Sequence, residues 1–508
     1  MELDRFVCDR ARRSRDARFD GRFFIGVTST KIYCRPICPA RSPKDENIRY
    51  FPTAAAAEAA GLRPCLRCRP EASPGTPAWF GTSSVVSRGL RLIGEGALDG
   101  AGVDRLADRL GVTARHLRRL FLQYLGAKPL QVALTRRAHF AKKLLDETAL
   151  PFNQVATAAG FGSLRRFNSH IRRTYSRTPT ALRRLARQAG RCDTESYRFC
   201  LAYRPPYDWD AMLAFLAARA TPGVESVGDR SYSRTITVDG KHGSISVVPS
   251  ASGAALELDV RFPEPRSLLF IVERVRRMFD LGADPAAIAD HLGADPLLRE
   301  PLRRHPGLRT PGAWHGFELS VRAILGQQIS VRGATTIAGR VAGMFGAPVE
   351  TGTGLTTLFP TPAQLADAPL EKAGVVPARA NAIRTLAQRV SDGTIVFSCT
   401  AGPAVLTSIS GIGDWTAQYI AMRALGEPDA FPSGDLILCR QAGCLTPRSL
   451  EQRSSEWRPW RAYAVMLLWR SAQDQVTSPR RIKNANPPHH SRHDRGRAVA
   501  GVAADGAR

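Results

Sequence analysis

Two pairs of closely spaced cysteines limit how the start of this chain can fold. The stretch YCRPICPAR contains Cys34 and Cys38, and after a gap of 26 residues RPCLRCRP contains Cys65 and Cys68. Two short pairs allow two loops to present four sulfurs to one tetrahedral ion. The spacing therefore predicts a zinc site, and we expect a small zinc-binding domain of mixed α and β structure around it.

Positive charge is concentrated in the first part of the chain. The 508 residues carry a formal net charge of +27; residues 1–190 hold 35 Lys and Arg against 15 Asp and Glu, and the tail from 477 holds 7 against 2. A basic half joined to a nearly neutral one indicates a nucleic-acid anchor beside a more selective domain. A solvated basic surface is the alternative interpretation.

No stretch of the sequence predicts a membrane span or a signal peptide. The longest apolar run, YAVMLLW at 463–469, is too short to cross a bilayer. We therefore expect a cytoplasmic protein without membrane contact. Disulfides are rare in that compartment, which again favours metal for the closely spaced cysteines.

Clusters of Pro, Gly and Ser divide the chain into four folded parts and a basic tail. Residues 85–187 show helical periodicity, residues 230–260 alternate as antiparallel strands do, and residues 317–470 are again helical. We expect a multidomain protein that is mainly α: an α+β zinc domain, a double helix-turn-helix domain, a second α+β domain and an all-α domain. The expected parts are 1–75, 82–187, 197–310, 311–476 and a disordered tail, 477–508.

The cysteine-bearing segments KIYCRPICPAR, ENIRYF and AAGLRPCLRCRP resemble the amino-terminal domain of Ada over residues 1–72. The resemblance implies that Cys34 both binds zinc and accepts a methyl group from a methylphosphotriester in DNA. Four thiolates on Zn²⁺ leave the site with a charge of about −2, which repels an ordinary phosphate more than a neutral triester. Methylation would lower that charge and raise DNA affinity. A purely structural zinc site is the alternative.

Residues 85–187 resemble the AraC-type DNA-binding domain, which carries two helix-turn-helix units. VATAAGFGSLRRFNSHIRRTYSRTP matches best, with recognition helices expected to begin near Thr113 and Ser163. The resemblance implies promoter DNA and RNA polymerase as partners. For any single arginine a solvated helix face is the alternative. The DNA-binding side chains expected on the two recognition helices are Arg115, Arg118, Arg165 and Arg166.

LTSISGIGDWTAQYIAMRAL (406–425) fits a helix-hairpin-helix, in which Gly411 and Gly413 let backbone N–H groups approach a DNA phosphate. With Asp435 in FPSGDLIL, it resembles the helix-hairpin-helix glycosylase superfamily. Residues 200–470 resemble AlkA, the 3-methyladenine DNA glycosylase II. The resemblance implies that Asp435 is catalytic and that an aromatic pocket stacks on the flipped, cationic base. The pocket residues expected are Trp415, Tyr419 and Trp469, for which core packing is the alternative, and the expected DNA contacts are Gln328, Gly411, Gly413 and Thr416.

Two positions depart from the AlkA relatives that the sequence resembles. Gln328 stands where a leucine wedge is usual, and Gly434 stands where a second carboxylate would be accepted. Trp415 occupies the place of the Schiff-base lysine of bifunctional members, so we expect hydrolysis without strand cleavage.

The sequence as a whole predicts a methyl-accepting regulator fused to a glycosylase for alkylated purines, acting in the cytoplasm on the nucleoid and on both damaged and promoter DNA. The alternative is a transcriptional regulator whose glycosylase half binds damage without catalysis.

Overall fold

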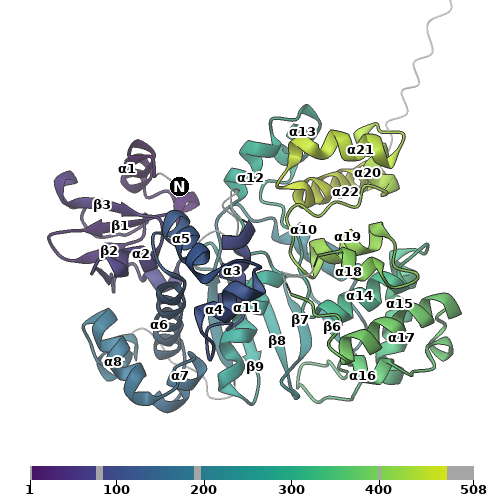
Figure 1. The fold of residues 1–508 in the computed structure, drawn as a ribbon, viewed down its shortest axis with the longest axis horizontal. Helices are drawn as coiled ribbons and strands as arrows, with labels where there is room; N and C mark the ends of the chain where they lie inside the picture. Colours follow the sequence, from purple (N-terminus) through teal and green to yellow (C-terminus); the bar gives the residue numbers. More distant parts are fainter. Residues whose placement is uncertain (1–2, 76–83, 188–195, 399–401, 478–508) are drawn as a thin grey trace, which may run out of the picture.

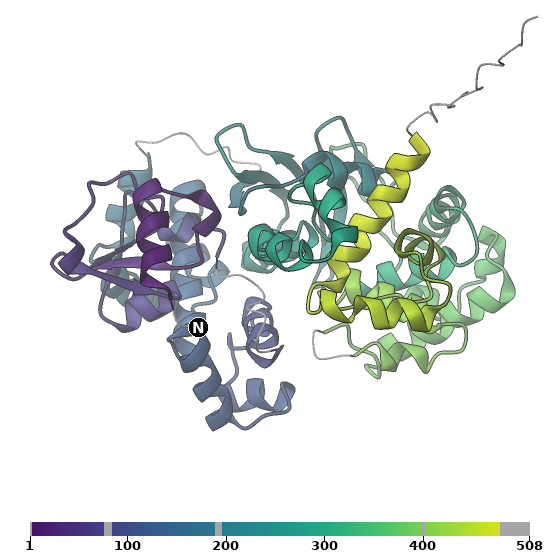
Figure 2. The ribbon, with the colours of Figure 1, turned by 90° about the horizontal axis from the view of Figure 1, so that it is seen from above.

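The computed structural model describes residues 3–75, 84–187, 196–398 and 402–477. Figure 1 shows the residues up to 187 on one side and the remainder on the other, and Figure 2 shows the two halves side by side from above. Most of the expected segment boundaries and the expected disordered tail lie in or next to ranges outside the described residues. The expected multidomain, mainly helical fold is confirmed.

The first domain is a four-stranded sheet covered by a helix on each face. The sheet order is β3-β1-β2-β4, with β1 antiparallel to β2 and β3, and β2 parallel to β4. Alternate side chains point to opposite faces of a strand, so Ile25 packs with α1 and Phe24 packs with α2. The elements are α1 (Arg5–Ser14), β1 (Phe24–Val27), β2 (Ile32–Cys34), β3 (Ile48–Phe51), α2 (Ala54–Ala59) and β4 (Arg63–Pro64).

The second domain consists of two helix-turn-helix units joined by one long helix, α6. Both expected recognition helices are confirmed as helices: Thr113 caps α5 by accepting from the His116 N–H at 3.2 Å, and Ser163 caps α8 by accepting from the Arg166 N–H at 3.2 Å. The helices are α3 (Ser84–Gly94), α4 (Val103–Arg109), α5 (Ala114–Leu125), α6 (Pro129–Glu147), α7 (Phe152–Ala158), α8 (Leu164–Tyr175) and α9 (Pro179–Arg187).

The first domain docks on α6 through a buried polar cluster around Glu58. The Tyr33 hydroxyl donates to Glu58 Oε1 at 2.8 Å, and the Thr135 hydroxyl donates to Oε2 at 2.6 Å. His139 Nε2 lies 3.5 Å from the same carboxylate and 3.0 Å from the Tyr33 hydroxyl. Tyr33 directly precedes Cys34. Through Tyr33 and Glu58, the cysteine-bearing segment is therefore connected to the long helix α6.

The third domain is a five-stranded antiparallel sheet flanked by helices, as the alternating pattern predicts. The strand order is β5-β9-β8-β7-β6. The elements are β5 (Tyr197–Ala202), α10 (Trp209–Ala217), β6 (Glu225–Val227), β7 (Tyr232–Val238), β8 (Lys241–Pro249), β9 (Ala255–Arg261), α11 (Leu268–Met278), α12 (Pro285–Leu292) and α13 (Pro296–Arg304).

The fourth domain has two helical cores. One contains residues of α14, α17 and α19, and the other contains residues of α20 and α22 together with α12 and α13. Tyr419 packs against both cores, which places it where they meet. The helices are α14 (Gly316–Leu325), α15 (Val331–Phe345), α16 (Pro362–Leu365), α17 (Pro377–Ser391), α18 (Ala404–Thr407), α19 (Asp414–Arg423), α20 (Leu436–Ala442), α21 (Pro447–Arg453) and α22 (Arg461–Thr477).

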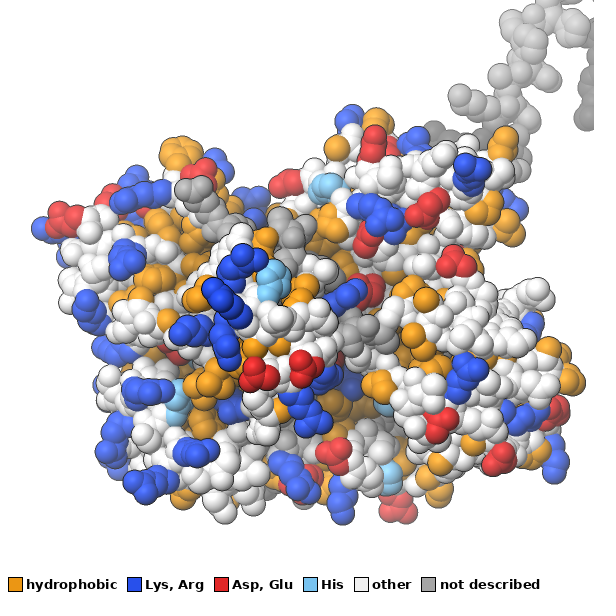
Figure 3. All heavy atoms as spheres, in the orientation of Figure 1, with side chains coloured by type: hydrophobic (Ala, Val, Ile, Leu, Met, Phe, Trp, Pro, Cys, Tyr) orange, Lys and Arg blue, Asp and Glu red, His pale blue; other side chains and the backbone are white. Residues whose placement is uncertain are grey.

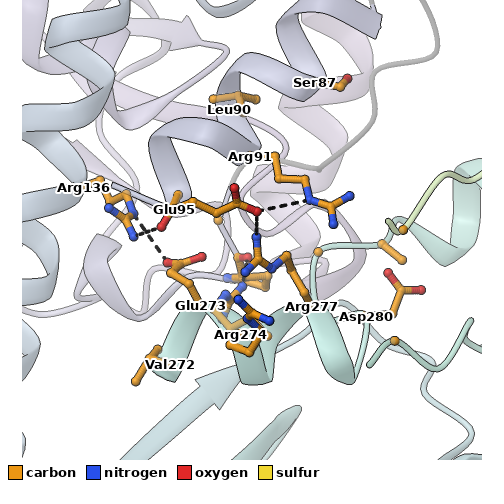
Figure 4. Close-up of a pocket in the computed structure, with 18 of the residues that line it drawn as sticks. Ser87, Leu90, Arg91, Glu95, Arg136, Val272, Glu273, Arg274, Arg277 and Asp280 are labelled. Atoms are coloured by element: carbon orange, nitrogen blue, oxygen red, sulfur yellow. Dashed lines mark hydrogen bonds and ion pairs between the residues drawn. The ribbon is translucent and has the colours of Figure 1, made fainter. Parts of the chain in front are cut away.

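The two halves meet around a cavity of about 690 Å³ lined by residues of all four domains. Ion pairs cross it: Glu95, directly after α3, pairs with Arg277 on α11, and Arg136 Nε on α6 lies 3.6 Å from Glu273 Oε1 on α11 (Figure 4). Apolar packing also joins the halves: the rings of Phe140 on α6 and Phe199 on β5 have centroids 6.1 Å apart, within one core that continues from the second domain into the third. None of the helices in the part of the chain that the structure describes has the length and apolarity of a membrane span.

Candidate functional site

The parallel pairing of β2 with β4 brings the two cysteine pairs together. Cys34 ends β2 and Cys65 follows β4, and the N–H of Cys65 donates to the Tyr33 carbonyl at 3.0 Å. Parallel strands end at the same edge of a sheet, so both cysteines leave it side by side. The sulfurs of Cys34, Cys38, Cys65 and Cys68 all lie within 4.8 Å of one another. This donor set fits one tetrahedral zinc ion.

The four cysteines differ in their access to solvent. Cys65 and Cys68 are buried, whereas Cys34 and Cys38 are half-buried at the outer side of the cluster. The backbone N–H of Arg35 donates to Cys68 Sγ at 3.4 Å, while the Arg35 guanidinium pairs with Asp20. The cluster is thus anchored through its buried pair, Cys65 and Cys68, and is accessible at Cys34 and Cys38.

Two exposed arginines near these cysteines were missed by the sequence prediction. Arg41 and Arg67 are exposed, and neither forms an ion pair with a residue that the structure describes. In the sequence, only their position could have indicated these arginines, because each stands within three residues of a cysteine of the cluster. Positive charge there would meet a DNA backbone.

The expected DNA-binding arginines lie on exposed faces of the two recognition helices. Within the described ranges none of them pairs with a carboxylate, so their charges remain available for phosphates or base edges. Figure 3 shows Lys and Arg side chains gathered over the region of α5. These exposed residues are Arg115 and Arg118 on α5, and Arg165 and Arg166 on α8.

The hairpin between α18 and α19 is braced by a neighbouring loop. Gly411 has φ +90°, and an added Cβ would lie 3.3 Å from Ala382, so glycine suits this turn. The Gln327 side chain donates to the Gly411 carbonyl at 2.8 Å and to the Thr416 hydroxyl at 3.1 Å. The Thr416 side chain is buried, so it supports the hairpin, and a DNA contact at that position would use the backbone. Gly413 is exposed beside the start of α19.

Gln328 extends from the same loop with φ +54°, a left-handed conformation that is uncommon for residues other than glycine. Its side chain is exposed, and the adjacent Ile329 is 36% exposed. The loop therefore presents one polar and one apolar side chain to solvent, next to the hairpin.

Four donors converge on the carboxylate of Asp435, which caps α20. Oδ1 accepts from the backbone N–H groups of Ile437 and Leu438, both at 3.0 Å, and from Trp469 Nε1 at 3.2 Å. Oδ2 accepts from Trp415 Nε1 at 3.0 Å. Hydrogen bonds from several directions fix the orientation of a carboxylate.

Two of the three expected pocket aromatics, Trp415 and Trp469, donate to this carboxylate, and Tyr419 lies against both of their rings. The rings of Trp415 and Tyr419 are parallel, with centroids 5.4 Å apart and an interplanar angle of 6°, and Trp469 is tilted by 46° to Tyr419 with centroids 6.3 Å apart. All three are half-buried; Tyr419 packs against both helical cores and Trp469 packs against the second. The sequence prediction missed Arg423, a buried residue on α19 whose Nη1 donates to the Tyr419 hydroxyl at 2.6 Å.

Comparison with known proteins gives three family matches along the chain. The metal-binding domain of Ada matches residues 7–71, a helix-turn-helix domain matches residues 106–185, and the AlkA N-terminal domain matches residues 198–315. A probable bifunctional transcriptional activator/DNA repair enzyme AlkA from Mycobacterium tuberculosis is 43% identical over 487 residues, covering 92% of this chain and 97% of the relative. The chain belongs to this bifunctional AlkA family.

Each half of this bifunctional AlkA chain also matches separate relatives. DNA-3-methyladenine glycosylase 2 from Escherichia coli is 33% identical over 282 residues, covering 53% of this chain and 96% of that protein. The bifunctional transcriptional activator/DNA repair enzyme Ada from Escherichia coli is 35% identical over 116 residues, covering 23% of this chain and 31% of that protein. The predicted resemblances to Ada and AlkA are confirmed, and so is the zinc-binding domain.

Proposed function

We propose that this member of the bifunctional AlkA family senses and repairs alkylated DNA on one chain. The amino-terminal domain takes a methyl group from a methylphosphotriester, the helix-turn-helix domain binds promoter DNA and contacts RNA polymerase, and the carboxy-terminal half excises alkylated purines. The protein would act in the cytoplasm, associated with the nucleoid. The observation that carries the repair function is the convergence of Trp415 and Trp469 on Asp435.

Methyl transfer is assigned to Cys34 because it is a half-buried member of the cluster on the strand that leads into it. The sulfur attacks the methyl carbon, the carbon–oxygen bond breaks, and the phosphodiester leaves with the electron pair. Bound zinc would keep the Cys34 sulfur in its thiolate form at neutral pH. Arg41 and Arg67 would hold the flanking phosphates while the neutral triester reaches the sulfur.

Base excision is assigned to Asp435 because its carboxylate is oriented from four directions beside the aromatic rings. A flipped base would stack on these rings, and the electron-rich indoles suit a cationic purine. As the glycosidic bond breaks, positive charge develops on the sugar, and a fixed carboxylate stabilises it. Water then completes the hydrolysis. No lysine stands at Trp415, so no Schiff base forms there.

The test incubates purified protein with DNA carrying radiolabelled methyl groups and scores label on protein and bases released. Cys34→Ala should lose protein label and keep base release, and Asp435→Asn should do the reverse. Matched controls are Cys200→Ala, an exposed cysteine outside the cluster, and Asp414→Asn, an exposed carboxylate on α19. Peptide mass spectrometry distinguishes Cys34 from Cys38, the other half-buried cysteine of the cluster.

Two outcomes contradict parts of the proposal. Label uptake without base release would make the carboxy-terminal half a damage-binding module of a regulator. Base release without label would make the four cysteines a structural zinc site. Transcription from a damage-inducible promoter with purified RNA polymerase tests the activator role, and methylated protein should outperform the unmethylated form.

A further inference from the structure

The cavity between the two halves of the molecule takes no part in the proposed methyl transfer or base excision. Its volume, about 690 Å³, lies in the range of small-molecule binding sites. Among the residues that line it, eight are Lys or Arg and six are Asp or Glu, an excess of two positive charges. The cavity is therefore electrostatically suited to an anion.

The acidic side chains on the wall drawn in Figure 4 are shared among several arginines. The carboxylate of Glu95, directly after α3, pairs with Arg277 on α11 and lies 3.6 Å from Arg91 Nε on α3. The carboxylate of Glu273 lies 3.6 Å from Arg136 Nε on α6. Two carboxylates thus face three guanidinium groups, and this part of the wall keeps a positive charge.

Arg274 on α11 adds a buried donor to the same wall. Across the ranges that the structure describes it forms no ion pair; its Nη1 donates to the Trp314 carbonyl, and its guanidinium carbon lies 4.6 Å from the centroid of the Phe270 ring. Its Nε is buried and has no hydrogen-bond partner among those residues. Burial and the charge of Arg277 lower the pKa of Arg274. A buried charge and a buried N–H group without acceptors both cost free energy, which an anion beside them would offset.

Arg276 gives the cavity a further guanidinium group that is bound by carbonyls instead of carboxylates. It donates to the Ala202 carbonyl at 3.4 Å and to the Pro74 carbonyl, and it forms no ion pair within the described part of the chain. Burial lowers its pKa as well. The positive charge of the cavity therefore extends along α11.

The arrangement of the arginines favours phosphate over carboxylate. Figure 4 shows guanidinium groups that come from three elements: Arg91 from α3, Arg136 from α6, and Arg274 and Arg277 from α11. A tetrahedral phosphate accepts hydrogen bonds from several directions, whereas a carboxylate accepts them close to one plane. Guanidinium groups also match the geometry of phosphate oxygens.

We propose that this cavity binds a small phosphate-bearing anion with two or more negative charges, whose phosphate oxygens contact Arg274 and Arg277. Because α3 and α6 belong to the helix-turn-helix domain and α11 to the third domain, both halves of the molecule would contact the anion. Binding would therefore stabilise the contact between the halves. This site does not depend on the proposed repair activities.

The experiment titrates full-length protein with inorganic pyrophosphate by calorimetry, in magnesium-free buffer at about 0.15 M salt, which screens weak surface binding. We expect one pyrophosphate per chain. Arg274→Met should weaken binding by about 10- to 100-fold, the loss expected for one hydrogen bond to a charged group. Arg266→Met, which removes an exposed arginine from the turn before α11, is the matched control and should stay within about twofold of the wild type.

Thermal unfolding separates a binding role of Arg274 from a structural one. Arg274→Met removes a buried charge that has no carboxylate partner in the described ranges, so the variant alone should unfold close to the wild-type temperature. Pyrophosphate should raise the unfolding temperature of the wild type and leave that of the variant unchanged. Should Arg274→Met not fold, Arg274→Gln replaces it, because glutamine keeps a donor and removes the charge.

Two further ligands identify the source of the phosphate. Tighter binding of ATP than of pyrophosphate would indicate a nucleotide, and equal affinity would indicate that the phosphate groups suffice. Citrate, a carboxylate of similar charge, should bind at least about tenfold more weakly, and equal binding of citrate would overturn the assignment to phosphate.

A basic DNA-binding protein can also bind pyrophosphate on its recognition helices. The double variant Arg165→Met and Arg166→Met should therefore bind pyrophosphate as the wild type does. Loss of binding in this variant with full binding in Arg274→Met would overturn the proposal, as would the absence of pyrophosphate binding to the wild type.

Discussion

The indole N–H of Trp415 donates to Oδ2 of Asp435 at 3.0 Å, and this hydrogen bond joins two consecutive helices. Trp415 belongs to the hairpin helix α19 and Asp435 caps α20. The same residue thus supplies a stacking surface and orients the carboxylate. A change that moves the Trp415 ring therefore also changes the orientation of the Asp435 carboxylate.

Replacing Trp415 by Phe keeps a ring and removes the N–H donor. Because a hydrogen bond to a charged group is worth about 1.5–3 kcal/mol, base release in a single turnover should slow by roughly 10- to 100-fold. Trp469→Phe, which removes the donor to Oδ1, is the matched comparison and should have a similar effect. Unchanged rates in both variants would show that these donors do not orient Asp435.

Replacing Gln328 by Leu places an apolar side chain at the exposed tip of the loop held by Gln327. An apolar wedge fills the space of a flipped base better than an amide, so affinity for a duplex with an abasic-site analogue should increase about three- to tenfold. Gln328→Gly removes the plug and suits the φ of +54°, so it should bind more weakly while folding normally. Equal affinity of all three proteins would show that the plug contributes nothing.

Replacing Glu58 by Gln removes the charge at the contact between the first domain and α6. Burial raises the pKa of Glu58, but His139 and the hydroxyl donors bring it below its ordinary value, so the stabilisation is present above that value and is lost as pH falls through the folded pKa. At pH 7 the variant should lose about 1–3 kcal/mol of unfolding free energy, measured by urea titration. The exposed Glu46→Gln is the control and should change little.

Reversing Glu273 to Arg tests the contact between the two halves of the molecule. Two arginines would then face each other across the cavity where Arg136 and Glu273 now pair (Figure 4), and the contact between the halves should loosen beside the apolar core that they share. Small-angle X-ray scattering should report a larger radius of gyration, and Arg136→Glu in the same chain should restore it. High salt should expand the wild-type protein, since about 1 M salt screens charges beyond roughly 3 Å. A variant as compact as the wild type would contradict an electrostatic contact.

His315 makes part of the stability depend on pH. Its Nδ1 accepts from the Phe317 N–H at 3.2 Å at the start of α14; although part of the residue is exposed, the surrounding protein and the charges of Arg274 and Arg234 lower its pKa to about 4. The neutral form is therefore favoured by folding: this stabilisation is full above about pH 6.5 and declines as pH falls toward 4. Because His315 borders the open cavity, the loss should be about 1 kcal/mol or less. His315→Asn, which keeps a capping oxygen, should flatten the unfolding free energy between pH 7 and 5.

Much of the candidate site could be predicted from the sequence because its signals are local. The spacing of Cys34 and Cys38 limits them to one loop, Ser163 is a capping residue before a helical pattern, and the glycines of the hairpin permit one tight turn. The family comparison confirmed the Ada-type metal-binding domain, the helix-turn-helix domain and the relation to AlkA. Arg423 and the arginines near the cysteines were missed because a buried and an exposed arginine look alike in a sequence.

By itself, then, the sequence determined the kinds of domain, the identity of the metal ligands and the presence of a carboxylate after a helix-hairpin-helix. Only the tertiary structure decided that parallel pairing brings Cys34 beside Cys65, and that Trp415, Trp469 and Asp435 converge from three helices. It also decided that Arg423 has no carboxylate partner within the described residues. The reason is physical: spacing controls contacts within a turn or two of chain, whereas burial, charge pairing and hydrogen bonding depend on which distant segments pack together.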